Sequence, residues 1–232
     1  MVYVTSDLHG YPLEKFREML ARAGFSAEDF LFVLGDVIDR GPDGVRLLRW
    51  MAEQPNVQLI LGNHEAMLLS CGFLFEAVTE ESLDRLDTGK LALLGTWMEN
   101  GAAPTLAALR RLLKAEPEVL EGILDLLRDA PLYDTVTAGG RDFLLVHSGL
   151  EHFRPGRPLE DYAPEELLWA RPTLETVYGG PLVIFGHTPT ECFGSQFRGR
   201  PVITDTWICI DTGAAAGNKP MLLRLDDMKA FE

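Results

Sequence analysis

The chain has 232 residues, of which 47% are hydrophobic and 24% are charged, a composition typical of a folded globular protein with a sizeable core. Its formal net charge of −14 argues against nucleic acid as a partner, because proteins that neutralise a phosphate backbone are normally basic. The longest apolar runs have the length of strands, far below the roughly 20 residues of a membrane-spanning helix, so we expect no membrane partner.

The N-terminal residues and the cysteines predict a cellular compartment. Residues 1–5 lead straight into a strand pattern, without the basic and apolar segments of a signal peptide. Cys71, Cys192 and Cys209 are odd in number and lack the spacing of zinc ligands or of a CxxC pair. We therefore expect free thiols in a cytoplasmic protein.

Residues 1–61 predict a β-α-β-α-β succession. Short apolar runs typical of buried strands alternate with segments in which apolar residues recur at helical spacing. Because helical crossovers connect parallel strands, this succession indicates a parallel sheet. All three strands end in polar residues, at the edge where α/β sheets bind their ligands. Strands are expected at 2–4, 30–34 and 57–61, and helices at 13–23 and 45–51.

Residues 66–128 form an insertion that we expect to be helical throughout. Breaks between helices are expected near Thr88-Gly89, from Gly101 to Pro104, and at Pro117. Apolar stripes at helical spacing predict that these helices pack as a cap, which is well placed to form one wall of a cleft. No linker or repeat divides the chain, so we take residues 1–232 as a single domain.

From residue 131 the pattern returns to strands. Residues 132–137 and 141–146 flank a Gly-Gly turn signal, which predicts a hairpin. Residues 151–163 are expected to form a loop, and 164–170 a short helix. Further strands are expected at 182–185, 202–203, 207–210 and 221–225.

Five of the predicted strands are followed by polar clusters, and these clusters contain all the histidines except His152. Taken alone, an Asp or Asn beside glycine usually marks a turn. Because nearly every histidine of the chain falls in these segments, we interpret the clusters together as a metal site. The residues are Asp7 and His9, Asp36 and Asp39, Asn63 and His64, His147, and His187.

The ligand types in this set indicate which metals would bind and what they would do in the reaction. Carboxylate, imidazole and amide ligands without a thiolate favour manganese, iron or zinc over calcium or magnesium. We expect two divalent ions, Mn²⁺ first, with iron or zinc as alternatives. Two ions about 4 Å apart can activate a water molecule and hold the substrate oxygens at the same time.

Individual roles follow from position in the clusters. Asp36 is expected to end its strand rigidly and, with its two oxygens, to bridge the ions. His64 is a candidate general acid, because its neighbour Asn63 is the better candidate ligand, and Asp39 could orient it. Arg40 is best placed by sequence to pair with phosphate oxygens.

Five motifs, in this order, resemble the motif set of the calcineurin-like metallophosphoesterases. The ending Asp39-Arg40-Gly41 resembles the phosphoprotein phosphatase branch, in particular its compact bacterial and phage-type members. The resemblance implies a four-layer α/β/β/α sandwich of two mixed sheets flanked by helices, and therefore a second sheet. The motifs are Ser6-Asp7-Leu8-His9-Gly10, Gly35-Asp36-Val37-Ile38-Asp39-Arg40-Gly41, Gly62-Asn63-His64-Glu65, His147-Ser148-Gly149 and Gly186-His187-Thr188-Pro189.

The resemblance also implies the role of each site residue. His64 becomes the general acid, paired with Asp39, and Arg40 binds phosphate. The ligands of one metal would be Asp7, His9 and Asp36, and those of the other Asp36, Asn63, His147 and His187.

Three further residues acquire roles through the resemblance. Arg171, which follows Leu168-Trp169, is implied as a second phosphate-binding arginine, and Asn63 could also touch the phosphate. Trp97 lies in a segment that resembles the Trp-x-x-Asn-Gly motif of the compact members. It could line the cleft or belong to the helical core. Ser6 departs from the glycine that is more usual in the family.

These observations predict a metal-dependent phosphoester hydrolase that acts on a phosphorylated protein or a small phosphoester. We favour a serine/threonine protein phosphatase with additional action on phosphotyrosine. The alternative is a bis(5'-nucleosyl)-tetraphosphatase, whose motifs are similar and for which the 66–128 insertion could supply a nucleoside cleft. A non-catalytic metal-dependent binding protein is a third hypothesis, but such proteins usually lose a ligand or the acid, and here none is missing. The oligomeric state stays open.

Overall fold

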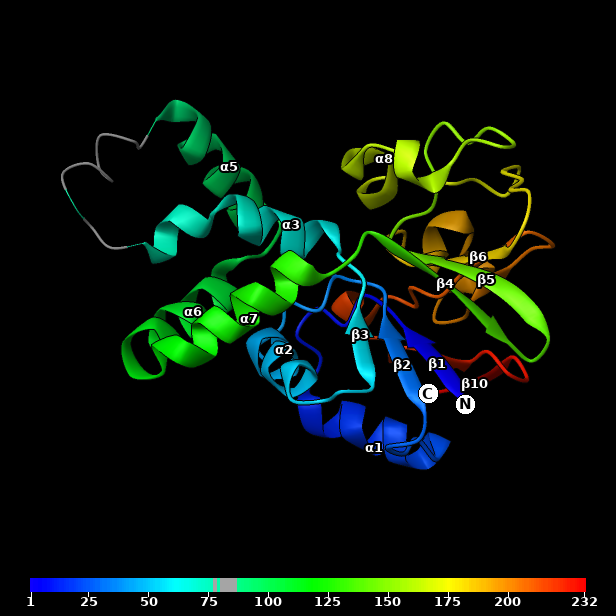
Figure 1. Cartoon of the computed structure of the whole chain (residues 1–232), viewed down its shortest axis with the longest axis horizontal. Coiled ribbons are helices and arrows are strands. Elements are labelled where there is room, and N and C mark those ends of the chain that lie inside the picture. Colours follow the sequence, from blue (N-terminus) through cyan, green and yellow to red (C-terminus); the bar gives the residue numbers. More distant parts are fainter. Residues whose placement is uncertain (77–78, 80–86) are drawn as a thin grey trace.

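The computed structural model of this chain describes residues 1–76, 79 and 87–232, and it contains two five-stranded sheets (Figure 1). In sheet A the order is β10 (Lys229–Phe231), β9 (Leu222–Arg224), β1 (Val2–Thr5), β2 (Phe30–Val33) and β3 (Val57–Leu59). In sheet B it is β4 (Tyr133–Ala138), β5 (Arg141–Val146), β6 (Leu182–Phe185), β8 (Trp207–Cys209) and β7 (Val202–Ile203).

Both sheets are mixed. β1, β2 and β3 are parallel, as the β-α-β-α-β succession predicts, while β9 and β10 run antiparallel beside them. In sheet B, β4 and β5 form the predicted hairpin, β5, β6 and β8 are parallel, and β7 is antiparallel. β10 was not predicted, because this short edge strand is largely exposed and carries no run of apolar residues.

Several strands end earlier than predicted. Leu34, Ile60 and Ile210 follow β2, β3 and β8, and they lie outside the strands although their side chains are fully buried. The apolar run in the sequence therefore continues into a buried loop, and hydrophobicity alone does not mark where the hydrogen-bonded ladder stops.

The alternation of side chains along each strand builds the layers. Val4 and Phe32 point toward sheet B, where they pack with Leu145 and Ile184 in a core between the two sheets. The neighbouring residues of β1 and β2 point to the other face of sheet A and pack against helices. The spacing of the two sheets is therefore set by close packing of apolar side chains.

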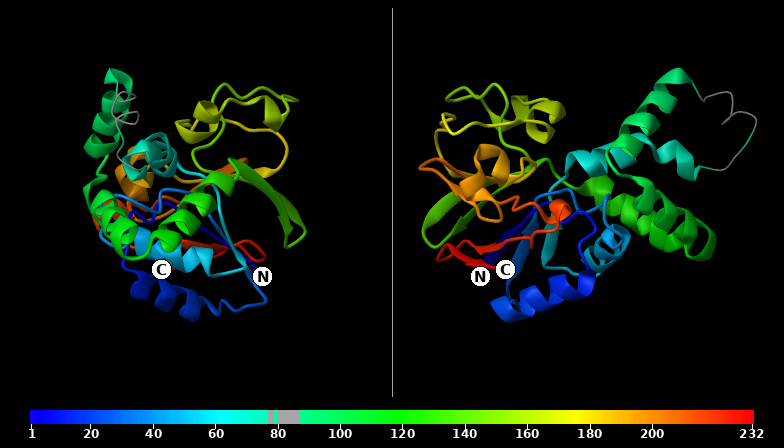
Figure 2. Two further views of the ribbon diagram at one scale, coloured as in Figure 1. Left: turned by 60° about the vertical axis from the view of Figure 1, so that its left-hand side comes forward. Right: turned by 180° about the vertical axis from the view of Figure 1, so that it is seen from behind.

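Helices cover the outer faces (Figures 1 and 2). The outer face of sheet A is covered by α1 (Leu13–Ala23) and α2 (Gly44–Ala52), and α6 (Ala103–Ala115) and α7 (Pro117–Asp129) continue the same apolar core by packing against α2. The outer face of sheet B is covered by the short α8 (Pro164–Leu168), by 3-10 turns and by residues 150–162. The implied four-layer sandwich is confirmed, with a thin fourth layer. None of the described helices is long and apolar enough to cross a membrane.

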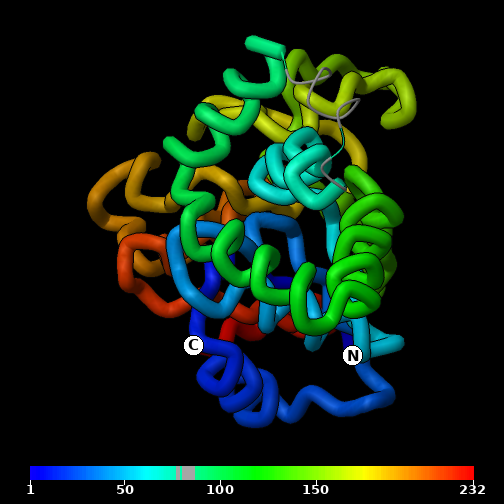
Figure 3. The backbone as a smooth tube through the Cα atoms, turned by 90° about the vertical axis from the view of Figure 1, so that its left-hand side faces the viewer, coloured from blue at the N-terminus to red at the C-terminus, as the bar shows by residue number. Residues whose placement is uncertain are grey.

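The helical insertion is divided between the outer layer and the site. It contains the end of α3 (Asn63–Ser70), η1 (Gly72–Phe75), α5 (Thr88–Glu99), α6 and α7. The predicted breaks from Gly101 to Pro104 and at Pro117 are confirmed, while 77–78 and 80–86 lie outside the described residues. α6 and α7 lie side by side (Figure 3) and pack against α2 and α3, so they extend the helical layer outside sheet A. α3, α5 and α6 reach the polar strand ends, the last through the hydroxyl of Thr105, which accepts the amide of Asp39 at 2.9 Å.

The core between the sheets makes a stability prediction. We expect Ile184→Ala to lower the free energy of unfolding by about 2–5 kcal/mol, because it leaves a cavity in the fully buried layer. The matched change Ile203→Ala, at a side chain that is 66% exposed on β7, should cost less than about 0.5 kcal/mol. Urea unfolding followed by circular dichroism measures both, and equal costs would contradict this placement of the core.

Candidate metal centre

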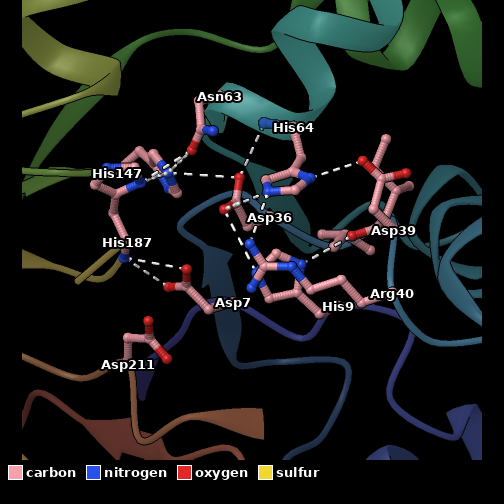
Figure 4. A network of polar contacts seen from close by, with 12 residues as sticks. Asp7, His9, Asp36, Asp39, Arg40, Asn63, His64, His147, His187 and Asp211 are labelled. Carbon is pink, nitrogen blue, oxygen red and sulfur yellow. Dashed lines mark hydrogen bonds and ion pairs between the residues drawn. The ribbon is translucent and has the colours of Figure 1, made fainter. Parts of the chain in front are cut away.

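The predicted polar clusters converge where loops leave the carboxyl ends of strands in both sheets (Figure 4). Sheet A supplies the loops after β1 and β2 and the first turn of α3 after β3, and sheet B supplies the loops after β5 and β6. Arg40 and Arg171 are exposed at the rim. All the other predicted site residues are buried: Asp7, His9, Asp36, Asp39, Asn63, His64, His147 and His187.

The loops hold several of these residues in the left-handed backbone region, which non-glycine residues rarely adopt. Asp7, His9, Asp36 and His187 have φ angles of 50°, 42°, 54° and 64°. Each such residue costs about 1–3 kcal/mol, and strain of this kind clusters at functional sites. Hydrogen bonds between loops oppose the strain, since the amide of Asp7 donates to the carbonyl of Gly35 and the amide of His9 to that of Asp36, at 3.1 and 2.8 Å.

Asp36 does not end its strand, which corrects the prediction. β2 ends at Val33, and Asp36 is held in the following loop by the carboxylate of Glu65. The amides of Asp36, Val37 and Ile38 donate to Glu65 at 2.8, 2.9 and 3.3 Å. Burial, with the neighbouring Asp36 adding to it, raises the pKa of Glu65 to about 7. Sequence reasoning gave Glu65 no role, and its place in the Gly62–Glu65 motif was the available signal.

Backbone carbonyls fix the tautomers of two histidines. Nδ1 of His147 lies 2.7 Å from the carbonyl of Leu34, and Nδ1 of His9 lies 3.1 Å from that of Ile38. A carbonyl oxygen only accepts, so each Nδ1 carries the proton and each Nε2 keeps a lone pair. Burial lowers the pKa of His9 to about 4 and also lowers the pKa of His147, so both imidazoles are neutral near pH 7.

These lone pairs face Asp36 from two sides. Nε2 of His9 lies 3.6 Å from Oδ2 of Asp36, and Nε2 of His147 lies 3.4 Å from Oδ1. A lone pair that faces a buried carboxylate oxygen is repelled by it, whereas a cation between the two atoms attracts both. The geometry therefore fits one divalent cation on each side of Asp36.

The side of Asp36 toward sheet B offers further donor atoms. Oδ1 of Asn63 lies 2.9 Å from Nε2 of His147 and 3.0 Å from Nδ1 of His187. The two ring nitrogens are 3.2 Å apart. Burial, together with the neighbouring His147 and Arg171, lowers the pKa of His187 to about 2. The predicted set of Asp36, Asn63, His147 and His187 is thus brought together around one point.

Asp7 lies at the site, but its carboxylate faces the backbone of His187 rather than the other candidate ligands. Both of its carboxylate oxygens accept the amide of His187, at 3.1 and 2.9 Å. Among the described residues, the groups that could hold an ion are His9, Asp36 and His64 on one side and Asp36, His147 and His187 on the other, and Asp7 belongs to neither.

A second buried acid lies near Asp7. Asp211 is 4% exposed, and burial raises its pKa to about 7. Burial and then the charge of Asp211 raise the pKa of Asp7 well above its ordinary range. Sequence reasoning interpreted Asp211 as a turn residue. The available signal was an acid beside Thr212-Gly213 directly after a strand, the same pattern that marks the other clusters.

His64 is paired with Asp39 as predicted. Nδ1 of His64 lies 2.7 Å from Oδ2 of Asp39, and the indole of Trp97 donates to the same oxygen at 2.8 Å. Burial opposes the charged form of His64, but the carboxylates of Asp36 and Asp39 outweigh it and hold its pKa above the ordinary value. Trp97 is fully buried, so it belongs to the core rather than to a cleft wall, and it positions Asp39 from α5.

The other nitrogen of His64 points into the site. Nε2 lies 3.8 Å from Oδ2 of Asp36, and Nη2 of Arg40 contacts the same nitrogen at 3.2 Å. From this position, Nε2 of His64 could either bind a metal ion on the His9 side of Asp36 or transfer a proton to a bound phosphate. Arg171 borders the cluster from sheet B, where Nη1 donates to the hydroxyl of Thr188 at 3.3 Å.

The fold and the site define the class of protein. Residues 1–191 match the model of the calcineurin-like phosphoesterase family. The chain belongs to this family, and the resemblance stated from its motifs is confirmed.

Two relatives and one solved structure show which proteins this chain resembles. A bis(5'-nucleosyl)-tetraphosphatase of the asymmetrical type from Bacillus velezensis is 26% identical over 243 residues, covering 93% of this chain and 85% of that relative. A symmetrical bis(5'-nucleosyl)-tetraphosphatase from Acidovorax sp. is 32% identical over 151 residues, covering 64% of this chain and 44% of its own length. A solved structure provisionally assigned as a diadenosine tetraphosphatase has a TM-score of 0.63 at 20% identity, covering 99% and 90% of the two chains, and shows the shared fold.

The two aspartates after β2 should differ in their effect on metal. We expect Asp36→Asn to lose most bound Mn²⁺, since it removes charge between the imidazoles, and Asp39→Asn to keep it, since that carboxylate faces His64 and Trp97. Elemental analysis after Mn²⁺ reconstitution measures this, with His152→Asn at an exposed histidine as control. Loss of metal from Asp39→Asn would show that Asp39 does more than orient His64.

Proposed function

We propose that the chain is a metal-dependent hydrolase of bis(5'-nucleosyl) tetraphosphates. The observation that carries the proposal is Asp36 with a neutral imidazole at each of its oxygens, an arrangement that suits two divalent ions. The similarity to the Bacillus velezensis tetraphosphatase, which spans nearly all of this chain, supports the substrate class. Our first preference from the motifs, a serine/threonine protein phosphatase, is the less well supported of the two hypotheses.

The lengths of the matches favour asymmetrical cleavage. The asymmetrical relative matches over 93% of this chain and 85% of its own length, whereas the symmetrical relative from Acidovorax sp. matches over 44% of its own length. We therefore propose that a tetraphosphate bridge is cut into one and three phosphates.

Two divalent ions, Mn²⁺ as our first expectation, would be held on the two sides of Asp36. His9 would bind on one side, together with Asp7 once its carboxylate turns away from the amide of His187. The residues of the other side would be Asn63, His147 and His187. When bound, such ions lower the pKa of a coordinated water molecule and neutralise negative charge on phosphate oxygens.

The protein's own groups would complete the hydrolysis. The water oxygen loses a proton to solvent and forms a bond to phosphorus, the bridging P–O bond breaks, and the departing oxygen takes a proton from Nε2 of His64. Asp39 stabilises the protonated imidazole, and Trp97 fixes the orientation of Asp39. Because the sequence retains every predicted ligand and the acid, the non-catalytic binding protein is the weakest of the three hypotheses.

Arginines would provide the local positive charge that an acidic protein needs to bind a polyphosphate. Arg40 contacts Nε2 of His64 at the position where a leaving oxygen would lie, so it can exchange this contact for the phosphate. Arg171 reaches the loop after β6 of sheet B, where it donates to the hydroxyl of Thr188. A phosphate would therefore meet donors from both sheets.

Product analysis tests the substrate and the position of cleavage. We expect the Mn²⁺-loaded protein to convert diadenosine tetraphosphate to AMP and ATP, separated by anion-exchange chromatography, with Asp36→Asn as the inactive control. Two molecules of ADP would show symmetrical cleavage. Turnover of a phosphoserine peptide without turnover of diadenosine tetraphosphate would restore the protein phosphatase hypothesis.

A leaving-group comparison tests the role of His64. We expect His64→Asn to slow hydrolysis of phenyl phosphate by about 10²–10⁴-fold, because a basic leaving oxygen needs a proton. The loss on p-nitrophenyl phosphate should be smaller, because that oxygen is weakly basic. Steady-state rates for both esters measure the difference, and Asp39→Asn should follow the same trend. Equal losses on the two esters, together with loss of metal, would make His64 a ligand.

A further inference from the structure

One tryptophan is exposed beside the metal centre and has no part in the hydrolysis proposed above. Trp169 is 43% exposed, whereas Trp50, Trp97 and Trp207 are 7%, 0% and 0% exposed. Its ring meets the ring of His187 edge-on, with centroids 5.7 Å apart and an interplanar angle of 89°. The indole therefore presents a large aromatic surface to solvent directly beside a candidate metal ligand.

The chain around Trp169 is held rigidly to the site. The hydroxyl of Ser148 donates to the carbonyl of Leu167 at 2.7 Å and accepts the amide of Ala170 at 2.9 Å. The amide of Trp169 itself donates to the carbonyl of Glu165 at 3.1 Å, which closes the end of α8. Because Ser148 directly follows His147, the indole keeps a fixed position relative to the metal centre. A fixed aromatic surface binds a ligand with little loss of conformational entropy.

Arg171, two residues after Trp169, adds the positive charge that binding of a nucleotide requires. Arg171 reaches Thr188, the neighbour of His187, so a guanidinium and an indole border the same histidine loop. Arg171 also lines a shallow cavity of about 280 Å³ together with Pro172 and Val177, while Trp169 lies outside that lining. An aromatic face binds any nucleobase by stacking, while an arginine pairs with the attached phosphate.

We propose that Trp169 is the platform on which one nucleobase of the substrate stacks, which makes it a specificity-determining residue. The proposal rests on the proposed function, because it assigns to Trp169 the nucleoside part of a dinucleoside polyphosphate. The competing explanation is that the indole only shields His187 from water. The two differ in their consequences, since a shield affects every phosphate ligand and a platform affects only those that carry a base.

Matched ligands separate these explanations. ADP and inorganic pyrophosphate carry the same number of phosphates and differ by the nucleoside, and calorimetric titration into the Mn²⁺-loaded protein gives both dissociation constants. We expect Trp169→Leu to weaken ADP binding about 5- to 150-fold more than pyrophosphate binding, the range for one lost base stack. Trp169→Phe, which keeps an aromatic face, should retain most of the preference for ADP. Parallel loss for both ligands in Trp169→Leu, or no loss for either, would overturn the proposal.

Fluorescence gives a second readout that does not depend on turnover. ADP should quench the tryptophan emission of the Mn²⁺-loaded protein more than pyrophosphate does, and Trp169→Phe should abolish that difference. A quench that persists in Trp169→Phe would place the base near another tryptophan and refute the platform. If the wild-type protein does not hydrolyse diadenosine tetraphosphate, the proposed function fails, while the binding difference still decides the role of Trp169.

Discussion

The buried carboxylate of Asp36 faces the lone pair of a neutral imidazole at each of its two oxygens, and much of the structure serves to keep it there. Without a cation these contacts are repulsive, so the arrangement is stable only because several stronger constraints impose it. The carbonyls of Leu34 and Ile38 fix the histidine tautomers, and Glu65 ties the Asp36 loop to α3 through three amides. The site is therefore preorganised for positive charge before any ion binds.

The two sheets contribute opposite halves of this arrangement. His9 comes from the loop after β1 in sheet A, and His147 comes from the loop after β5 in sheet B. The distance between them depends on the apolar layer between the sheets, in which Val4 and Phe32 pack with Leu145 and Ile184. A close-packed core resists expansion, so it holds the two imidazoles on either side of Asp36. The core thus contributes to metal geometry as well as to stability.

Elements on the two sides of the metal centre position the remaining functional residues. On one side, α5 buries Trp97 against Asp39 and so orients His64, the candidate acid. On the other side, the segment after α8 presents Trp169 and Arg171 to the solvent beside His187. Within the helical insertion, α6 and α7 pack against α2 and α3, and α6 also holds the amide of Asp39 through the hydroxyl of Thr105. We therefore expect the metal centre to carry out the chemistry that the family shares, and the bordering segments to select the phosphate compound on which it acts.

The sequence by itself determined the three parallel strands, the hairpin and the set of residues that meet at the strand ends, because periodicity and short motifs are local properties of the chain. It could not determine that Asp36 is held by Glu65, that Asp7 faces the amide of His187 or that Asp211 lies near Asp7. These contacts join residues 29, 180 and 204 positions apart, and they form only when the sheets pack. Long-range packing also decided that Trp97, within α5, is buried, whereas Trp169, directly after α8, is exposed. The sequence thus determines which chemical groups are available. The tertiary structure determines the direction in which each group points, because the elements that pack around a side chain decide which partners it contacts.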